Sequence, residues 1–412
     1  MMSEEKKKNS GLYGNVLSLG FVSFFTDISS EMVFSILPSF ILGLPGAGYA
    51  VLGLIEGLAE FLSYALRSVS GVFSDKFRRR KLLVFIGYAF STMTKPLFAV
   101  ANTAFEVLVV RVSDRVGKAV RTSPRDALLS ESVPEDQMGK VFGIHRTLDQ
   151  LGAIIGPVLA SSLILFLGVT VRDIFWLSFI PGSIALIILL LFVKEKVSKS
   201  TTETRILQGM RLVLKGRFPL LILVVGVFSI GAFNFSIILA KAEDIGIPEA
   251  IIPLVYAVIN ITHVVIAIPS GMLSDRIGQE KVLIMGYGAF LLSALLLSQR
   301  IISPAYIFLV ALIYGLYMGI VETIQRAMIP KYAPTEFKGT AYGLYYLVVG
   351  IGFFIANSVV GALWAYAGSA VAASYSVGTS IAAIVGMILF LKARASGIKY
   401  RTTRFPLGTS NS

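Results

Sequence analysis

Residues 111–126 read Arg-Val-Ser-Asp-Arg-Val-Gly-Lys-Ala-Val-Arg-Thr-Ser-Pro-Arg-Asp. Apolar residues precede this stretch at 107–110 and follow it at 127–129, so the periodicity predicts one long apolar helix and not a loop. At about 100° per residue, the charged side chains fall within a sector of roughly 140°. A charge at the centre of a bilayer costs at least about 2.5–3.5 kcal/mol if it faces lipid. The charged face must therefore line water, form ion pairs, or do both.

Two interpretations of this charged face are open. A lattice of buried ion pairs would only hold helices together, whereas a polar cavity would carry substrate and protons. We favour the cavity, because charges inside a membrane usually mark transport pathways, and the two can coexist. The first candidate site residues are therefore Arg111, Asp114, Arg115 and Lys118.

The composition indicates a polytopic membrane protein. The chain has 412 residues, 55% of them hydrophobic, and a mean hydropathy of +0.78. Only 15% are charged, against about 25% in soluble domains. The net charge of +13 is not a nucleic-acid footprint, because Lys and Arg gather in short links between apolar spans. With no Cys and two His, we expect no disulfide, metal site or cofactor.

The hydropathy pattern predicts the membrane topology, since about 20 apolar residues span a bilayer. Twelve spans are expected at 13–43, 49–73, 82–101, 104–131, 138–167, 171–193, 218–240, 249–274, 280–299, 304–330, 337–366 and 369–392. Lys and Arg gather in alternate links such as 74–81 and 194–217, so the positive-inside rule places these links and both termini in the cytoplasm. We expect a monomeric, multi-pass protein of the cytoplasmic (inner) cell membrane.

The two halves of the chain repeat one another. Gly71-Val-Phe-Ser-Asp75 recurs as Gly271-Met-Leu-Ser-Asp275. Duplicated halves predict an all-α fold of two pseudo-symmetric six-helix bundles with a site at their interface. The expected domains are an N-terminal bundle (1–193), a cytoplasmic linker (194–217), a C-terminal bundle (218–393) and a cytoplasmic tail (394–412).

These repeated links resemble those of the major facilitator superfamily, and the resemblance covers nearly the whole chain. The family's link between the second and third helices reads G-x-x-x-D-R-x-G-R-R. Its positions hold Gly71, Asp75, Lys76, Arg79 and Arg80 here, with Arg78 in place of the central Gly. The resemblance implies two bundles that rock around a central site, and a cytoplasmic latch of Asp75, Arg79 and Glu131. With the matching motif of the second half, the latch residues are Gly71, Asp75, Arg79, Glu131, Gly271 and Asp275.

A second motif points to proton-coupled export. Gly152-Ala-Ile-Ile-Gly156-Pro157 places two glycines on one helix face, which allows close helix approach, and a proline that permits a bend. This pattern resembles the fifth-helix signature of the family's proton-coupled exporters and implies antiport. In their fourth span, which corresponds to 104–131 here, the exporters carry R-x-x-Q-G-x-G. Arg111 and Gly117 match its first and last positions, so the resemblance implies that Arg111 assists proton transfer.

Further charges are predicted inside the membrane. Asp27 and Glu31 lie one turn apart in the first span. Against Arg111 or Arg115 they would either exchange a proton for substrate or form a permanent ion pair, and both alternatives remain open. Glu56 and Lys95 are interpreted as lattice partners. The predicted substrate and proton pathway comprises Asp27, Glu31, Arg111, Asp114, Arg115, Lys118, Arg146, Asp149, Asn234, Glu322 and Arg326.

The sequence therefore predicts a secondary active transporter that works by alternating access. We expect proton-coupled export of a small molecule, anionic or zwitterionic, with the bilayer and protons as its other partners and no nucleic acid. Uptake or exchange of an organic anion is the alternative, because the fourth predicted span (104–131) is rich in Arg and Lys. A membrane-embedded enzyme or non-transporting sensor is less favoured, since no nucleotide-binding G-x-x-x-x-G-K-[ST] loop or hydrolase spacing occurs.

Overall fold

The computed structural model describes residues 2–76, 80–132, 138–195, 212–214, 216–299, 303–334 and 337–395. These residues form helices and no strands, in agreement with the predicted all-α fold. The helices of the first half are α1 (Met2–Phe34), α2 (Leu37–Leu42), α3 (Tyr49–Lys76), α4 (Arg80–Thr94), α5 (Leu97–Val100), α6 (Ala104–Glu131), α7 (Met138–Leu167), α8 (Val171–Leu177) and α9 (Phe179–Phe192). Those of the second half are α11 (Phe218–Ser229), α12 (Ser236–Asp244), α13 (Ile252–Ile277), α14 (Gln279–Leu297), α15 (Pro304–Tyr332), α16 (Lys338–Ala367) and α17 (Ser369–Ala395).

The helices agree with the predicted membrane spans. In the described ranges, 10 helical segments are long and apolar enough to cross a membrane, and each coincides with a predicted span. The remaining two predicted spans are 104–131 and 218–240. The first coincides with α6, which has 28 residues but carries the charged face. The second is divided between α11 and α12, with 12 and 9 residues, by a break at 230–235.

Local chemistry explains where several helices begin and end. Pro38 stands in the first turn of α2, and Pro96 is the N-cap of α5. Proline has no N–H to continue a preceding helix, so the spans that contain α2 and α5 are each divided into two helices. A capping box at Thr103 and Glu106 starts α6, because each side chain accepts a hydrogen bond from the other residue's backbone N–H. This cap fixes the register of the helix that carries the charged face.

Most helix packing occurs within each half. In the first half α1 packs against α7 and α9, while α6 packs against α3 and α4. In the second half α15 packs against α13 and α14, and α17 packs against α14 and α16. Across the halves, α3 runs along α16 and α7 meets α13. The α3–α16 approach depends on Gly53, because a Cβ there would lie only 3.0 Å from the Cα of Gly361.

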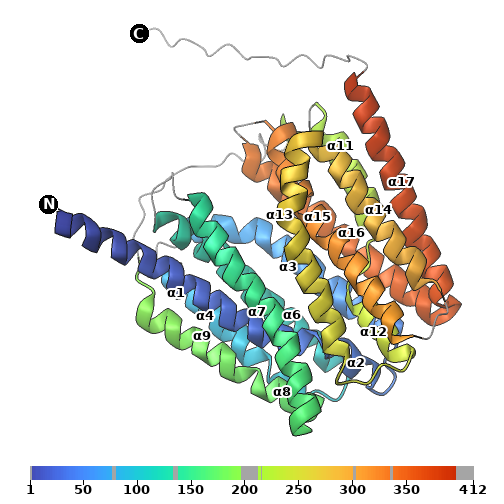
Figure 1. The fold of residues 1–412 in the computed structure, drawn as a ribbon, viewed down its shortest axis with the longest axis horizontal. Helices are drawn as coiled ribbons and strands as arrows, with labels where there is room; N and C mark the ends of the chain where they lie inside the picture. Colours follow the sequence, from blue (N-terminus) through green and yellow to red (C-terminus); the bar gives the residue numbers. More distant parts are fainter. Residues whose placement is uncertain are drawn as a thin grey trace.

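The two halves meet at one end of the molecule, which we call the closed end. Tyr49 stacks on Trp364 with ring centroids 4.8 Å apart, and its hydroxyl donates to the carbonyl of Ala240 at 3.1 Å. The hydroxyl of Ser161 donates to the carbonyl of Ala250 at 2.5 Å. Figure 1 shows α7 and α13 converging toward the end that carries α2, α8 and α12, and diverging toward the opposite end.

The predicted latch falls mostly outside the described part of the chain. Arg79 is not among the described residues, nor are the side chains of Asp75 and Glu131; Gly71 lies within α3. Gly271 and Asp275 lie near the end of α13, where Asp275 is exposed. The latch and the predicted domain boundaries therefore stay predictions.

Candidate functional site

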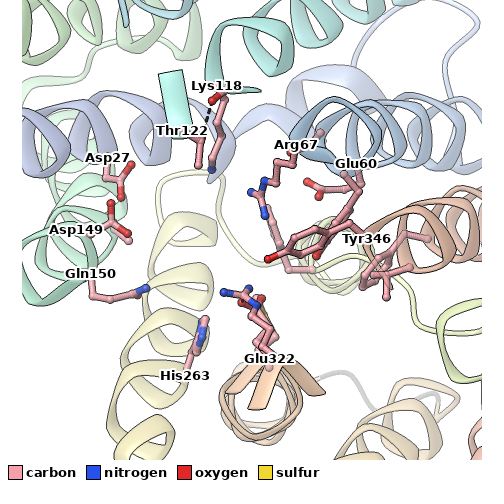
Figure 2. Close-up of a pocket in the computed structure, with 18 of the residues that line it drawn as sticks. Asp27, Glu60, Arg67, Lys118, Thr122, Asp149, Gln150, His263, Glu322 and Tyr346 are labelled. Carbon is pink, nitrogen blue, oxygen red and sulfur yellow. Dashed lines mark hydrogen bonds and ion pairs between the residues drawn. The ribbon is translucent and has the colours of Figure 1, made fainter. Parts of the chain in front are cut away.

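A polar cavity of about 680 Å³ lies between the two halves. Its walls come from α1, α3, α6 and α7 of the first half and from α11, α13, α15 and α16 of the second. Figure 2 shows side chains from these walls pointing toward a common centre. The volume falls within the range of about 300–1,000 Å³ that is usual for small-molecule sites.

The cavity collects most of the predicted pathway residues. Those that line it are Asp27, Glu31, Arg115, Lys118, Arg146, Asp149, Asn234, Glu322 and Arg326. Arg111 and Asp114 do not line it, so their predicted orientation toward the cavity is corrected. Asp114 instead accepts a hydrogen bond from Ser91 of α4 at 2.5 Å.

Arg111 belongs to a buried ion pair between α6 and α3. Its guanidinium lies 2.7 Å from the carboxylate of Glu56, and the two side chains are 0% and 2% exposed. The guanidinium also lies 3.8 Å from the ring centroid of Phe34. Removing one partner of such a pair leaves an uncompensated buried charge, so this contact has the character of the lattice considered above.

The same pairing is repeated one turn further along α6. Arg115 lies 2.8 Å from Glu60 of α3, which is one turn after Glu56. The sequence placed Asp27 and Glu31 of α1 as the counter-charges of these arginines. That prediction is corrected, because α3 and not α1 presents its carboxylates in register with Arg111 and Arg115.

A second network joins α1, α6 and α7 at the cavity wall. Arg146 lies 3.0 Å from Asp149, and Asp149 also accepts a hydrogen bond from Ser23 of α1 at 2.5 Å. On α6, Arg125 lies 2.9 Å from Asp126 and also donates a hydrogen bond to the hydroxyl of Ser23 at 3.5 Å. These cationic side chains are therefore neutralised locally and are less available to a substrate than an unpaired charge.

Asp27, Glu31 and Lys118 line the cavity and, within the described part of the chain, form no such pair. Among the described residues, no ion pair within 4.0 Å involves Asp27, Glu31 or Lys118. Figure 2 shows the amine of Lys118 directed toward the centre of the cavity, and Asp27 facing Asp149. Glu31 accepts a hydrogen bond at 2.8 Å from the hydroxyl of Tyr256, which belongs to the other half.

The glycines of the α7 motif pack directly behind the two acids of α1. A Cβ on Gly152 would lie 3.0 Å from the Cβ of Asp27, and a Cβ on Gly156 would lie 3.0 Å from the Cβ of Glu31. Such distances leave no room for a larger residue without movement of the helices. The glycine face therefore holds the backbone of α1 where both carboxylates reach the cavity.

The proline of the motif has a contact of its own. Pro157 lies inside α7 and has no N–H, so the carbonyl four residues earlier, that of Ala153, loses its helical donor. The side-chain amide of Asn260 on α13 donates to this carbonyl at 2.9 Å. One turn earlier on α13, Tyr256 reaches Glu31. Thus α13 contacts both α1 and α7 at positions that the motif defines.

The second half contributes few charges and many aromatic rings. Glu322 and Arg326 form an ion pair of 2.8 Å on α15, and His263 of the neighbouring helix α13 lies next to them (Figure 2). Asn234 accepts hydrogen bonds from the N–H and hydroxyl of Ser236, each at 2.9 Å, at the break between α11 and α12. Tyrosines that the sequence analysis did not propose as site residues also line the cavity: Tyr64, Tyr256, Tyr314, Tyr317, Tyr345 and Tyr346.

Membrane-length helices packed in two halves around a polar cavity define the fold of a polytopic membrane transporter. A sequence model of the Major Facilitator Superfamily matches residues 19–357 and, in a second match, 220–406. The chain therefore belongs to this family.

Relatives extend over most of the chain. An MFS-type transporter of Methanocaldococcus jannaschii is 34% identical over 394 residues, which are 94% of this chain and 97% of that protein. The multi-drug resistance efflux pump PmrA of Streptococcus pneumoniae is 25% identical over 367 residues, covering 86% and 88% of the two chains. A variant of the nucleoside transporter NupG has a similar solved structure, with a TM-score of 0.76. That match covers 92% of this chain and 99% of NupG at 14% identity, so it shows the fold alone.

Proposed function

We propose that this transporter couples the inward movement of protons to the export of a small charged molecule. One observation carries the proposal: in a cavity where ion pairs engage most of the charges, Asp27 and Lys118 have no ion-pair partner among the described residues. Unpaired charges inside a membrane protein are costly, and where they occur they usually mark binding sites or transport pathways. We propose action as a monomer, because the cavity is built within one chain.

The proposed direction of transport rests on topology. The positive-inside rule places the links after α3 and α9 in the cytoplasm, so the closed end faces outward and the cavity communicates with the cytoplasm. In alternating access the contacts of the closed end break as contacts at the opposite end form. The described state is then one that accepts a cytoplasmic substrate, and the name of the pneumococcal relative, an efflux pump, supports export.

Asp27 and Glu31 are the proposed proton carriers. Both acids lie on α1, both reach the cavity, and the α7 glycines typical of proton-coupled exporters pack against their backbone. Glu31 also accepts the hydrogen bond from Tyr256 across the halves. A proton on Glu31 would weaken that contact, since a hydrogen bond to a charged acceptor is the stronger kind. Protonation is thereby linked to opening of the closed end.

Proteoliposomes with an imposed pH gradient test this proposal. Proton flux through the protein is followed with a trapped pH indicator after addition of ethidium, benzoate or phenylalanine, which are a cationic, an anionic and a zwitterionic probe. We expect at least one probe to release the gradient, and Asp27→Asn to abolish that release. Glu249→Gln is the matched control, because Glu249 is exposed and does not line the cavity. Asp27→Asn with unchanged substrate-dependent proton flux would reject Asp27 as carrier.

Exchange of an organic anion is the second candidate function. Lys118 favours it, since this unpaired cation reaches the cavity centre (Figure 2). The same proteoliposomes distinguish the two functions. Benzoate counterflow that does not depend on the pH gradient supports exchange, and gradient-dependent flux supports proton coupling.

A further inference from the structure

Two side chains of opposite charge type, an acid and an amine, lie on neighbouring walls of the cavity. Asp27 on α1 and Lys118 on α6 both line it, and among the described residues neither has an ion-pair partner within 4.0 Å. Figure 2 shows Lys118 reaching the centre, with Asp27 on the adjacent wall. A ligand that carried only one charge would leave the other of these two groups without a partner. A ligand with both charges would satisfy both, as buried charges require.

Other parts of the cavity wall offer aromatic surface with free hydroxyl groups. Tyr64, Tyr317 and Tyr346 line the cavity, and in the described part of the chain none of their hydroxyls has a hydrogen-bond partner. Their rings are held by neighbours: Tyr64 lies 5.9 Å from Tyr346, and Tyr317 lies 5.1 Å from Tyr314, between ring centroids. Fixed aromatic faces suit flat rings, because aromatic pairs gain energy beyond the area that they bury.

We propose, on the basis of the transport function proposed above, that the substrate is an aromatic zwitterion. Its cationic nitrogen binds at Asp27, its carboxylate binds at Lys118, and its ring lies against the tyrosines of α3, α15 and α16. The cationic and anionic groups are bonded to the same carbon of the substrate, as in an α-amino acid. A cavity of about 680 Å³ accommodates a molecule of this kind together with water.

This substrate class also explains how antiport is enforced. Asp27 can hold a proton or face the substrate ammonium, but a protonated carboxyl group no longer attracts the cation. Substrate and proton therefore exclude each other at one side chain. Lys118 holds the carboxylate of the substrate in place while Asp27 releases the substrate ammonium. A compound without a carboxylate therefore binds but is positioned less well.

Four probes, each differing from the first in one group, test the assignment. Phenylalanine carries all three features; 2-phenylethylamine lacks the carboxylate, 3-phenylpropionate lacks the ammonium, and cyclohexylalanine lacks the aromatic ring. Binding to the full chain in nanodiscs is measured by calorimetry. We expect phenylalanine to bind about tenfold to a hundredfold more tightly than either singly charged probe, as expected for one lost hydrogen bond to a charged group. Cyclohexylalanine should bind a few-fold more weakly than phenylalanine.

Variants assign each feature to its residue. In Lys118→Met, phenylalanine and 2-phenylethylamine should bind equally; in Asp27→Asn, phenylalanine and 3-phenylpropionate should bind equally. Tyr346→Leu should remove the preference for phenylalanine over cyclohexylalanine. A singly charged probe that binds as tightly as phenylalanine to the unchanged protein would overturn the assignment. So would absence of binding by all four probes at millimolar concentration.

Failure of this assignment can be told apart from failure of the proposed function. Proton flux driven by ethidium or benzoate, without binding of phenylalanine, would leave proton-coupled export in place and reject the zwitterion. Phenylalanine binding with the expected variant pattern, but without any proton flux, would keep the substrate class and reject the coupling.

Discussion

The charged face of α6 contains two regions that differ in surroundings. Arg111 is fully buried and lies 2.7 Å from Glu56, whereas Lys118, about two turns further along, enters the cavity without an ion-pair partner among the described residues. The difference lies in α3, which presents Glu56 and then Glu60 in register with the arginines of α6. Its next turn offers Ser63 and Tyr64 to the cavity. The neighbouring helix, and not the charge itself, decides whether a position is structural or open to substrate.

Breaking the buried pair should have the largest effect on stability. Arg111→Met leaves the carboxylate of Glu56 buried without a partner, so the free energy of unfolding should fall by about 3–5 kcal/mol. Denaturation of the purified protein in nanodiscs measures this. The double variant Arg111→Met/Glu56→Leu should recover most of the loss, because neither charge is then left alone. An Arg111→Met protein as stable as the parent would show that the pair is not a lattice element.

Disturbing the glycine face behind the acids should have the next largest effect. A methyl group at Gly152 would stand 3.0 Å from the Cβ of Asp27, so Gly152→Ala should cost about 1–3 kcal/mol through overpacking of α7 on α1. Gly143→Ala is the matched control on the same helix, because a Cβ at Gly143 has no heavy atom within 4 Å. Equal stability of the two variants would show that close packing at Gly152 does not stabilise the protein.

Removing the contact between α13 and the motif proline should mainly change the balance between conformations. Asn260→Leu leaves the carbonyl of Ala153 without a donor, and should weaken the closed end by about 1–3 kcal/mol. The chain has no Cys, so single cysteines added at Ser161 and Ala250 can carry spin labels whose separation reports the closed end. We expect the population with separated labels to rise.

Pro157→Ala supplies the control for that prediction. Alanine restores the helical N–H that Ala153 lacks, so Asn260→Leu should have a smaller effect in this background than alone. Additive effects of the two changes would contradict the proposed link between the proline and Asn260.

The sequence predicted the spans well because hydropathy and charge in links are local properties. It also singled out Gly152 and Gly156 correctly as a close-packing face, since spacing of four on a helix fixes one side. The sequence alone did not show that Pro38 and Pro96 interrupt helices, because Pro157 occurs inside α7 without ending it.

Pairing between helices could not be predicted from one helix alone. Arg111, Asp114 and Lys118 lie in the same angular sector of α6. In the structure, however, Arg111 contacts α3 and Asp114 contacts α4. Glu56 and Glu60 were visible in the sequence, but their register against α6 depends on how two helices cross. The role of Asn260 depends on a carbonyl that only the backbone of another helix reveals.

The smallest expected change in stability belongs to Lys118, and it gives the sharpest comparison with Arg111. Lys118→Met removes a charge that has no ion-pair partner in the described ranges, so the free energy of unfolding should not fall. Substrate-dependent proton flux should nevertheless be lost, because the cavity no longer holds the anionic group of the substrate.

The decisive measurement is proton flux per folded molecule for Arg111→Met and Lys118→Met in the same proteoliposomes. We expect the folded fraction of Arg111→Met to keep its flux, although the family resemblance implies a proton-transfer role for Arg111. We expect Lys118→Met to fold normally and to lose its flux. The opposite outcome, loss of flux in folded Arg111→Met with flux retained in Lys118→Met, would contradict the division of the α6 charges into a structural pair and a working site.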